Sequence, residues 1–200
     1  VRLDGQSTLG LSPRQLVAHG IARSFQVPQL FPEMTVREHI LFALALAGRK
    51  GMLGALDSEA RGRSAEALMQ RFNLLAIADR AVSQVPQGQR KLIDIAMALT
   101  LKPKLLLLDE PTSGVSSAEK LPLMEVVFEA IRAEGVTVLF VEHDMDVVQR
   151  YVTRILAFRD GIMIADGAPQ AVMNDELVAS AVLRRKPNGA AMSAQFGGGA

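Results

Sequence analysis

The sequence predicts an α/β fold in which helices cover a parallel sheet and a helical subdomain is inserted into the chain. In the second half of the chain, short apolar runs alternate with helical patterns, which is the order that parallel strands require. The runs are continuous rather than alternating, as is typical of strands buried on both faces. The predicted order is strand 105–108, helix 118–133, strand 136–141, helix 145–151 and strand 154–158.

The composition is that of one ordinary globular domain. The chain has 200 residues, 49% of them apolar, which is enough for a packed core. Lys plus Arg total 22 and Asp plus Glu total 21, so no overall field attracts nucleic acid and none is expected as a partner. Cysteine is absent, which excludes disulfides and a cysteine nucleophile. The apolar run 40–47 is far shorter than the roughly 20 residues of a membrane-spanning helix.

Residues with special backbone preferences define the elements at the start of the chain. Ser12 is suited to the N-cap of a helix, with Pro13 at the first helical position and Gln15 completing a capping box. Gly20 ends this short helix. The segment 21–26 then predicts a strand that ends at Gln26.

A mostly helical region is predicted from residue 35 to about residue 100. Two sets of apolar residues support it, because each recurs at the spacing of one helix face. The two sets are Ala65, Leu68, Met69 and Phe72, and Leu92, Ile95, Ala96 and Leu99. Later, residues 159–161 predict a hairpin turn, Pro169 begins a helix, and the glycine-rich residues 186–200 predict a flexible tail.

Polar side chains follow three of the predicted strands. Asp109 and Glu110 end one strand, Gln26 ends another, and His143 follows a third. The carboxyl ends of parallel strands meet at one edge of a sheet, which is where ligands bind. Adjacent acids on an extended chain point to opposite sides, so one can face a metal ion and the other a nucleophilic water. The alternative is that the acids solvate a strand end and that the histidine is structural.

The loop 85–89 precedes a predicted helix and contains Gly88. A glycine lets the backbone approach a ligand closely, and a helix N-terminus presents unpaired N–H groups to an anion. The alternative is an ordinary glycine-containing loop before a helix.

Four segments in this order, "FQ", "PQGQRKLIDIAMAL", "KLLLLDEPTSG" and "VLFVEHDM", resemble the nucleotide-binding subunit of ABC transporters over nearly the whole chain. The resemblance implies an ABC ATPase fold with a parallel-sheet core. The implied site residues are the Q-loop residue Gln26, the signature loop Val85, Pro86, Gln87, Gly88 and Gln89, the Walker B aspartate Asp109, the catalytic glutamate Glu110, the D-loop residues Ser113 and Gly114, and the switch histidine His143. Within the family, "GIARSFQVPQLFPEMTVREHI" looks most like the ATPases of branched-chain amino-acid importers and their amide and urea relatives.

The same resemblance implies a mechanism and a set of partners. Two such subunits close head to tail over two ATP molecules, and each signature loop completes the site of the other subunit. Glu110 would orient or deprotonate the attacking water, His143 would contact the γ-phosphate, and Asp109 with Gln26 would hold Mg²⁺. The expected partners are ATP, a second ABC ATPase subunit and transmembrane permease subunits. The expected location is cytoplasmic, peripheral on the inner face of the cell membrane.

One family motif is not found in the sequence. Nowhere does G-x-x-x-x-G-K-[ST] occur, the Walker A loop that holds the phosphates and places a hydroxyl on magnesium. Since the opening segment resembles the strand after this loop, we expect a truncated chain with very weak ATP binding and no useful hydrolysis by itself. Two further departures are Pro86, where the family commonly has serine, and Ser116, where aspartate is frequent.

These expectations divide the chain into four segments. They are a remnant of the N-terminal sheet region with the Q-loop at 1–32, a helical subdomain with the signature helix at 33–102, a parallel-sheet core at 103–185, and the tail at 186–200. Two alternatives to the importer ATPase stay open. One is a non-catalytic docking module that donates only its signature loop to a partner's site, and the other is a soluble ABC protein of translation or DNA repair.

Overall fold

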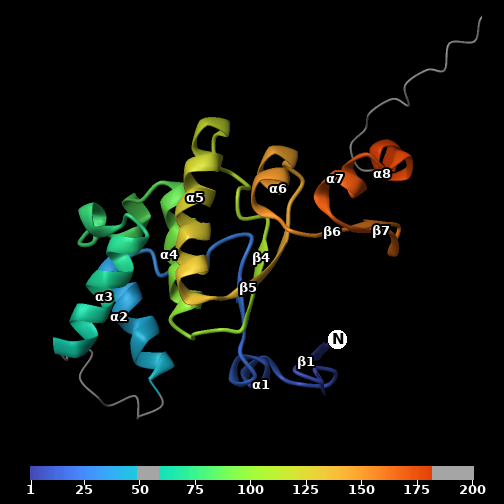
Figure 1. Cartoon of the computed structure of the whole chain (residues 1–200). Helices are drawn as coiled ribbons and strands as arrows, with labels where there is room; N and C mark the ends of the chain where they lie inside the picture. Colours follow the sequence, from blue (N-terminus) through green and yellow to red (C-terminus); the bar gives the residue numbers. More distant parts are fainter. Residues whose placement is uncertain (49–58, 182–200) are drawn as a thin grey trace, which may run out of the picture. The chain divides into compact units, whose positions relative to one another are not determined.

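The computed structural model describes residues 1–48 and 59–181 (Figure 1). The chain divides into two compact units, Val1–Val147 and Val148–Ala200. The tail predicted at 186–200 lies outside the described residues. Among the helices of the described ranges, none combines the length and the apolar character needed to cross a bilayer.

A three-stranded parallel sheet is the centre of the first unit. Its strands are β3 (Ile21–Ser24), β4 (Leu105–Asp109) and β5 (Thr137–Val141), in the order β3-β4-β5. Ile21 pairs with Leu105 and Leu105 with Thr137, so the three strands run in register toward one common edge. The α/β class with a parallel-sheet core is therefore confirmed.

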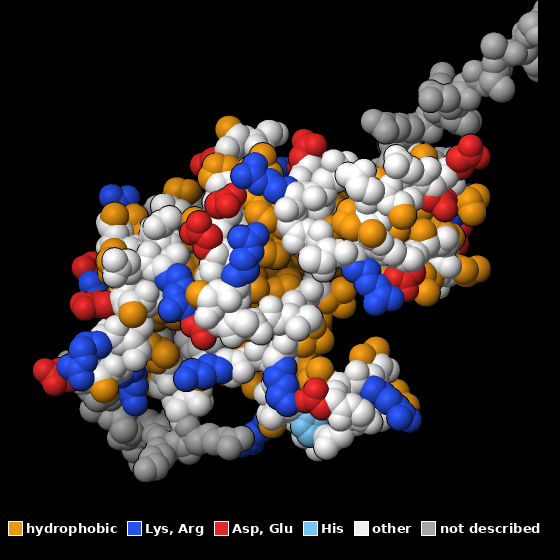
Figure 2. All heavy atoms as spheres, in the orientation of Figure 1, with side chains coloured by type: hydrophobic (Ala, Val, Ile, Leu, Met, Phe, Trp, Pro, Cys, Tyr) orange, Lys and Arg blue, Asp and Glu red, His pale blue; other side chains and the backbone are white. Residues whose placement is uncertain are grey.

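Helices pack on one face of this sheet. α4 (Gln87–Leu99) and α5 (Ser117–Glu134) lie side by side along β4 and β5, and α2 (Val36–Ala47) and α3 (Glu59–Arg71) pack in turn beside α4 (Figure 1). Over α3 and α5, Lys and Arg side chains are interspersed with Asp and Glu, in keeping with the nearly neutral chain (Figure 2). The remaining elements of the first unit are β1 (Arg2–Leu3), β2 (Gln6–Ser7), α1 (Pro13–Ala18), the 3₁₀ turns Leu75–Ile77 and Val82–Gln84, and the start of α6 (Met145–Tyr151).

The prediction that these strands are buried on both faces is wrong for β5. Phe140 points toward α5, where its ring lies 5.8 Å from the ring of Phe128 in an edge-to-face arrangement. The side chains that alternate with it face the other way, and Leu139 and Val141 are 50% and 63% exposed. The reason is that α4 and α5 cover only one face of the sheet in the part of the chain that the structure describes.

The core of the first unit contains side chains of α4 and β4, and of α3 with the residue that follows it. Met69, Phe72, Ile93, Ile95 and Leu106 are all fully buried. Each such side chain contributes about 1.5–3 kcal/mol through the apolar surface that it removes from water. The two sets of apolar residues predicted from the 3.6-residue spacing therefore face the core.

Capping boxes begin α1, as the sequence predicted, and also α2. Ser12 and Gln15 form a capping box at α1, with Pro13 in the first turn. Thr35 and Glu38 form a second capping box at α2. A hydrogen-bonded N-cap is worth about 1 kcal/mol, because it satisfies backbone N–H groups that the helix leaves unpaired.

The second unit contains a hairpin and two short helices. β6 (Ile155–Arg159) pairs antiparallel with β7 (Ile162–Gly167), so the predicted strand at 154–158 exists but does not belong to the parallel sheet. The two-residue turn of Asp160 and Gly161, whose φ values are 49° and 78°, returns the chain directly beside β6, so that β7 becomes its partner. α7 (Pro169–Met173) begins at the predicted proline and is followed by α8 (Glu176–Ala181).

Candidate functional site

Four side chains gather at the carboxyl edge of the parallel sheet. We call Gln26, Asp109, Glu110 and His143 the edge cluster. Asp109 is the last residue of β4, Glu110 follows it, and the other two come shortly after β3 and β5. The common direction of the strands brings these residues to one edge, although 84 residues separate Gln26 from Glu110 along the chain.

Glu110 joins three members of the edge cluster. The Gln26 side-chain amide donates to Glu110 Oε2 over 2.7 Å. The imidazole Nδ1 of His143 lies 3.9 Å from Glu110 Oε1. His143 is largely exposed, with 71% of its side chain accessible, so it can reach a ligand placed over the cluster. The geometry thus brings the predicted amide, acid and histidine together.

Asp109 has a different partner, which the sequence did not indicate. The Arg23 guanidinium donates to Asp109 Oδ2 over 2.7 Å, from the neighbouring strand β3. The same guanidinium lies 5.3 Å from the centre of the Phe25 ring. Both charged side chains are partly exposed, so this ion pair contributes little to stability and can open to release the carboxylate.

The backbone of Glu110 has a left-handed conformation, with φ of 44°. The prediction that two adjacent acids lie on one extended chain is therefore wrong at the second acid. This conformation costs a non-glycine residue roughly 1 kcal/mol or more. Three hydrogen bonds hold it: Glu110 N–H donates to Val141 O over 3.0 Å, and Glu110 O accepts from Ser113 N–H over 3.0 Å and from Lys91 Nζ over 2.7 Å.

Glu142 is a second acid that the sequence analysis did not single out. Its side chain is fully buried. One carboxylate oxygen accepts from the backbone N–H of Thr112, at 2.9 Å, and from the Thr112 hydroxyl, while the other accepts from the N–H groups of His143, at 3.0 Å, and Asp144, at 3.3 Å. Glu142 therefore ties the turn after β4 to the turn that presents His143.

The strand before Gln26 is shorter than predicted. β3 ends at Ser24, because the N–H of Phe25 donates to Asp94 Oδ2 over 3.1 Å instead of continuing the sheet. The hydroxyl of Ser24 donates to the same oxygen over 2.5 Å. Burial raises the pKa of the Asp94 carboxyl despite these hydrogen bonds. Asp94, on α4, thus fixes the backbone that leads into Gln26.

The predicted signature loop is mostly helical. Only Val85 and Pro86 precede α4, which begins at Gln87, so Gln87, Gly88 and Gln89 form its first turn. Pro86 occupies the N-cap without a side-chain hydrogen bond, which leaves the first N–H groups of the helix available.

Gly88 does not face open space in this structure. A Cβ atom there would lie 3.4 Å from Leu123 Cδ1 and 3.7 Å from Val115 Cγ1. The glycine therefore lets α4 pack closely against residues of its own chain, and the approach of its backbone to a ligand stays a prediction.

The residues predicted as the D-loop adjoin the start of α4. Ser113 donates its N–H to Glu110 O, which closes the turn after β4. Gly114 has φ of 75°, a conformation that glycine adopts without strain, and a Cβ there would lie 3.6 Å from Gln87 Cγ. The predicted signature and D-loop residues of one chain are thus neighbours.

The donor set of the edge cluster fits magnesium only together with phosphate oxygens. Among residues 1–48 and 59–181, no three His, Asp or Glu side chains converge closely enough to hold a metal ion by themselves. Asp109 offers one carboxylate and Gln26 one amide oxygen, both hard donors of the kind that Mg²⁺ prefers. Mg²⁺ in phosphoryl-transfer sites is bound through one or two carboxylates plus substrate phosphates, so the set fits a magnesium–nucleotide complex.

Sequence patterns gave only weak signs of the residues that support the cluster. Lys91 lies four positions before Ile95, which places a lysine on the buried face of α4. Burial lowers the pKa of this lysine. Glu142 stands directly before His143 at the end of an apolar strand. In both cases the sequence signal was a charged residue within or next to a run of residues predicted to be buried.

Comparison with known proteins shows the family to which this chain belongs. A family model described as "ABC transporter" matches residues 1–113. The crystal structure of the ADP conformation of MJ1267, an ATP-binding cassette of an ABC transporter, superposes with a TM-score of 0.72 and 28% identity, covering 88% of this chain and 73% of that chain. The chain therefore belongs to the ABC transporter family, and its predicted assignment to the ABC-type ATPases is confirmed.

Two curated relatives show which branch of the family the chain resembles. The high-affinity branched-chain amino acid transport ATP-binding protein LivG of Escherichia coli is 33% identical over 192 residues, which are 92% of this chain and 75% of LivG. The corresponding protein BraF of Pseudomonas aeruginosa is 30% identical over 191 residues, with the same two coverages. The predicted resemblance to this branch of the family is thus confirmed.

Proposed function

We propose that this chain is an ATP-binding subunit that powers uptake of branched-chain amino acids, or of related small amides, by ATP hydrolysis. The names of its two relatives support the solute class. The observation that carries the ATPase assignment is the convergence of Gln26 and His143 on Glu110 at the carboxyl edge of the sheet. An acid held between an amide and an imidazole, above a parallel sheet, is suited to orienting a water molecule beside a phosphate.

Glu110 and His143 are the proposed catalytic residues. Glu110 accepts a hydrogen bond from Gln26, and the same carboxylate can orient or deprotonate the attacking water. His143 is exposed beside it, so its ring can donate a hydrogen bond to the γ-phosphate. Catalysis would consist mainly of positioning and of stabilising charge on the transferred phosphoryl group.

Asp109 and Gln26 are the proposed magnesium ligands. Bound together with ATP, Mg²⁺ would neutralise the phosphate oxygens. Asp109 must exchange Arg23 for the ion, and Gln26, whose amide nitrogen donates to Glu110, must present its amide oxygen to the ion. Both changes are local, because the partners are exposed side chains.

The start of α4 and the turn after β4 are proposed to act on the ATP of a second ATPase subunit. The N–H groups of Gln87, Gly88 and Gln89 lie at a helix N-terminus, which favours an anion such as the γ-phosphate. Val85 and Pro86 complete this segment, and Pro86 offers no hydroxyl to the phosphate. Ser113 and Gly114 adjoin it in the same chain.

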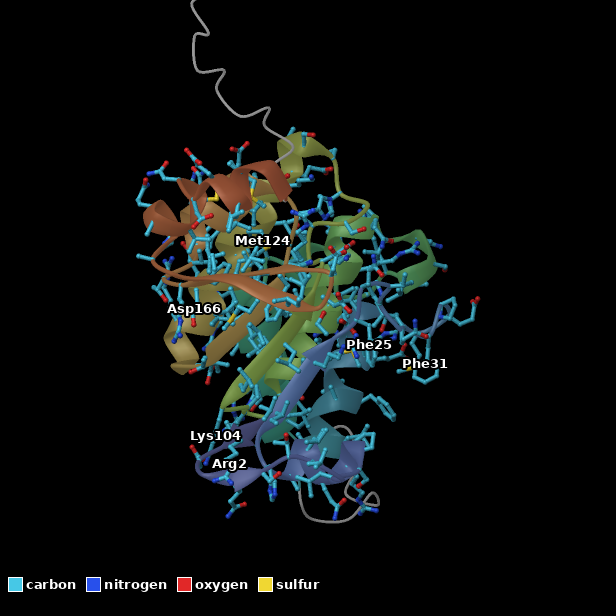
Figure 3. All side chains as sticks on the ribbon, turned by 90° about the vertical axis from the view of Figure 1, so that its right-hand side faces the viewer. Arg2, Phe25, Phe31, Lys104, Met124 and Asp166 are labelled. Carbon is cyan, nitrogen blue, oxygen red and sulfur yellow. The ribbon has the colours of Figure 1, made fainter. Side chains whose placement is uncertain are left out.

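The segment after Gln26 is the proposed docking site for a permease subunit. Val27 and Phe31 are 64% and 55% exposed, and Phe31 projects from the surface beyond the end of β3 (Figure 3). A small cavity of about 100 Å³ lies between this segment and the start of α4. His39, fully buried, secures the segment by accepting from the N–H of Phe31 over 2.9 Å. Docking there would place the chain at the inner, cytoplasmic face of the cell membrane.

The 200 residues contain no Walker A sequence, so we propose that by themselves they bind ATP weakly. This observation also favours the second candidate, a docking module that donates only its signature segment. Isothermal titration with magnesium and ATP tests the proposed weak binding. A dissociation constant near 1 mM or weaker, about −4 kcal/mol, is expected for the chain alone, and micromolar binding contradicts the proposal.

Replacing Glu110 in the assembled transporter tests the ATPase assignment. Glu110→Gln should lower turnover by about 10²–10⁴-fold, which is the usual contribution of a general base, while ATP stays bound. The matched control is Glu66→Gln on α3, whose side chain is 64% exposed and lies outside the cluster. Phosphate release and retained radiolabelled ATP are the measurements. Unchanged turnover in Glu110→Gln would show that this acid is not the base.

A further inference from the structure

Lys91 is the most deeply buried cation of the described chain, and its position on α4 is unusual for a lysine. Only 1% of the residue is exposed. Lysine is almost never fully buried unless a partner compensates the cost of removing its charge from water. The acids that surround the ammonium group are Glu142, Asp94, Glu110 and Asp109.

The hydrogen-bond partner of Lys91 is a backbone atom of the edge cluster. Its Nζ donates to the carbonyl oxygen of Glu110 over 2.7 Å. That carbonyl belongs to the residue whose φ is 44°, a conformation that persists only where its surroundings hold it. The second donor to the same oxygen is the N–H of Ser113, which belongs to the turn itself. Lys91 therefore attaches the carbonyl side of this turn to α4, whereas the N–H of Glu110 and the contacts of Thr112 attach the turn to β5 and to Glu142.

One turn further along α4, Asp94 makes a corresponding contact on the other side of the cluster. It accepts from the N–H of Phe25 and from the hydroxyl of Ser24, which together precede Gln26. A single rigid helix thus holds both backbones from which the hydrogen bond between Gln26 and Glu110 is made.

We propose that Lys91 is a positioning residue, which holds the Glu110 backbone in its left-handed conformation so that the Glu110 carboxylate stays in contact with Gln26 and beside His143. This role rests on the proposed function for its effect on turnover, although the backbone contact itself does not. Lys91 touches no reacting atom. It acts through the carbonyl of Glu110, with Asp94 as its counterpart on the Gln26 side.

The test replaces Lys91 with methionine, which keeps the length and apolar stem of the side chain and removes the ammonium group. Amide hydrogen exchange of the Glu110 and Ser113 N–H groups should become at least about tenfold faster, since local opening loses a restraint. In the assembled transporter, turnover should fall by about 10²-fold, as expected when a catalytic group is misplaced by around 1 Å. The KM for ATP should stay within about threefold, because the nucleotide contacts are made elsewhere.

Two further variants separate positioning from general stability. Lys91→Arg keeps a cationic donor and should restore most of the turnover. Met69→Ala, in the fully buried interface of α3, should lower the melting temperature without changing exchange at Glu110 or the turnover of folded protein. If Lys91→Met does not fold, Lys91→Gln replaces it, because its shorter side chain does not reach the carbonyl.

Each outcome decides the proposal. Unchanged exchange at Glu110 and Ser113 overturns it, whatever the ATPase rate. Faster exchange with unchanged turnover also overturns it, because the restraint would then have no catalytic effect. If the wild-type assembly hydrolyses no ATP, the proposed function fails, and the exchange experiment still decides whether Lys91 holds the Glu110 backbone.

Discussion

Glu142→Gln is expected to destabilise the protein strongly, although the substitution changes only one atom. The carboxylate of Glu142 is fully buried, and its two oxygens accept from four donors that belong to Thr112, His143 and Asp144. An amide has one oxygen, so its NH₂ group must face two of these donors. Two lost hydrogen bonds at roughly 1–2 kcal/mol each lower the free energy of unfolding by about 2–4 kcal/mol.

Urea denaturation followed by circular dichroism measures this loss. The control is Glu134→Gln, which removes the surface ion pair with Arg71 and should cost less than about 1 kcal/mol. The midpoint should shift without a change in slope, since the surface exposed on unfolding is the same. A loss as small as that of the control would refute the inference that Glu142 ties the two turns together.

The remaining predictions concern a partly buried ion pair and two helix glycines. Lys120 donates to Asp144 over 2.7 Å and holds the pKa of that carboxyl below its usual value. The resulting stabilisation is present at neutral pH and is lost as the pH falls through the lowered pKa, below about 3.9. The melting temperature of Asp144→Asn, measured between about pH 3 and pH 7, should therefore fall less on acidification than that of the wild type. Parallel curves for the two proteins would contradict this. Gly135 ends α5 with φ of 64°, so Gly135→Ala should cost about 1 kcal/mol in a denaturation experiment even though the space for a Cβ is open. Gly62→Ala on α3, also in open space but without positive φ, should instead stabilise the protein by about 0.5–1 kcal/mol, and equal effects at both glycines would contradict the conformational argument.

The sequence predicted the parts of the site that depend on strand direction. Asp109, Glu110 and His143 follow continuous apolar runs, and parallel strands bring such residues to one edge whatever the details of packing. The turn of Asp160 and Gly161 was equally visible, because glycine beside an aspartate is typical of a tight hairpin.

The contacts that shape the site depend on tertiary structure and were not predicted. Arg23 pairs with Leu107, and its guanidinium reaches Asp109 two positions further along β4 only once β3 and β4 pair in register. Burial of Lys91 and Glu142 follows from where α4 crosses the sheet, and periodicity along one helix or one strand does not specify that crossing. The same limit explains why the packing of Gly88 against Leu123 and Val115 was not predicted.

The packing of Gly114 against Gln87 has a mechanical consequence. α4 is a helix of 13 residues, about 20 Å long, whose backbone is continuously hydrogen-bonded. Its first turn abuts the Ser113–Gly114 bend, and the next turn carries the contacts to Glu110 and to the backbone before Gln26. A displacement of the first turn of this helix would therefore also shift the contacts to Glu110 and to the backbone before Gln26.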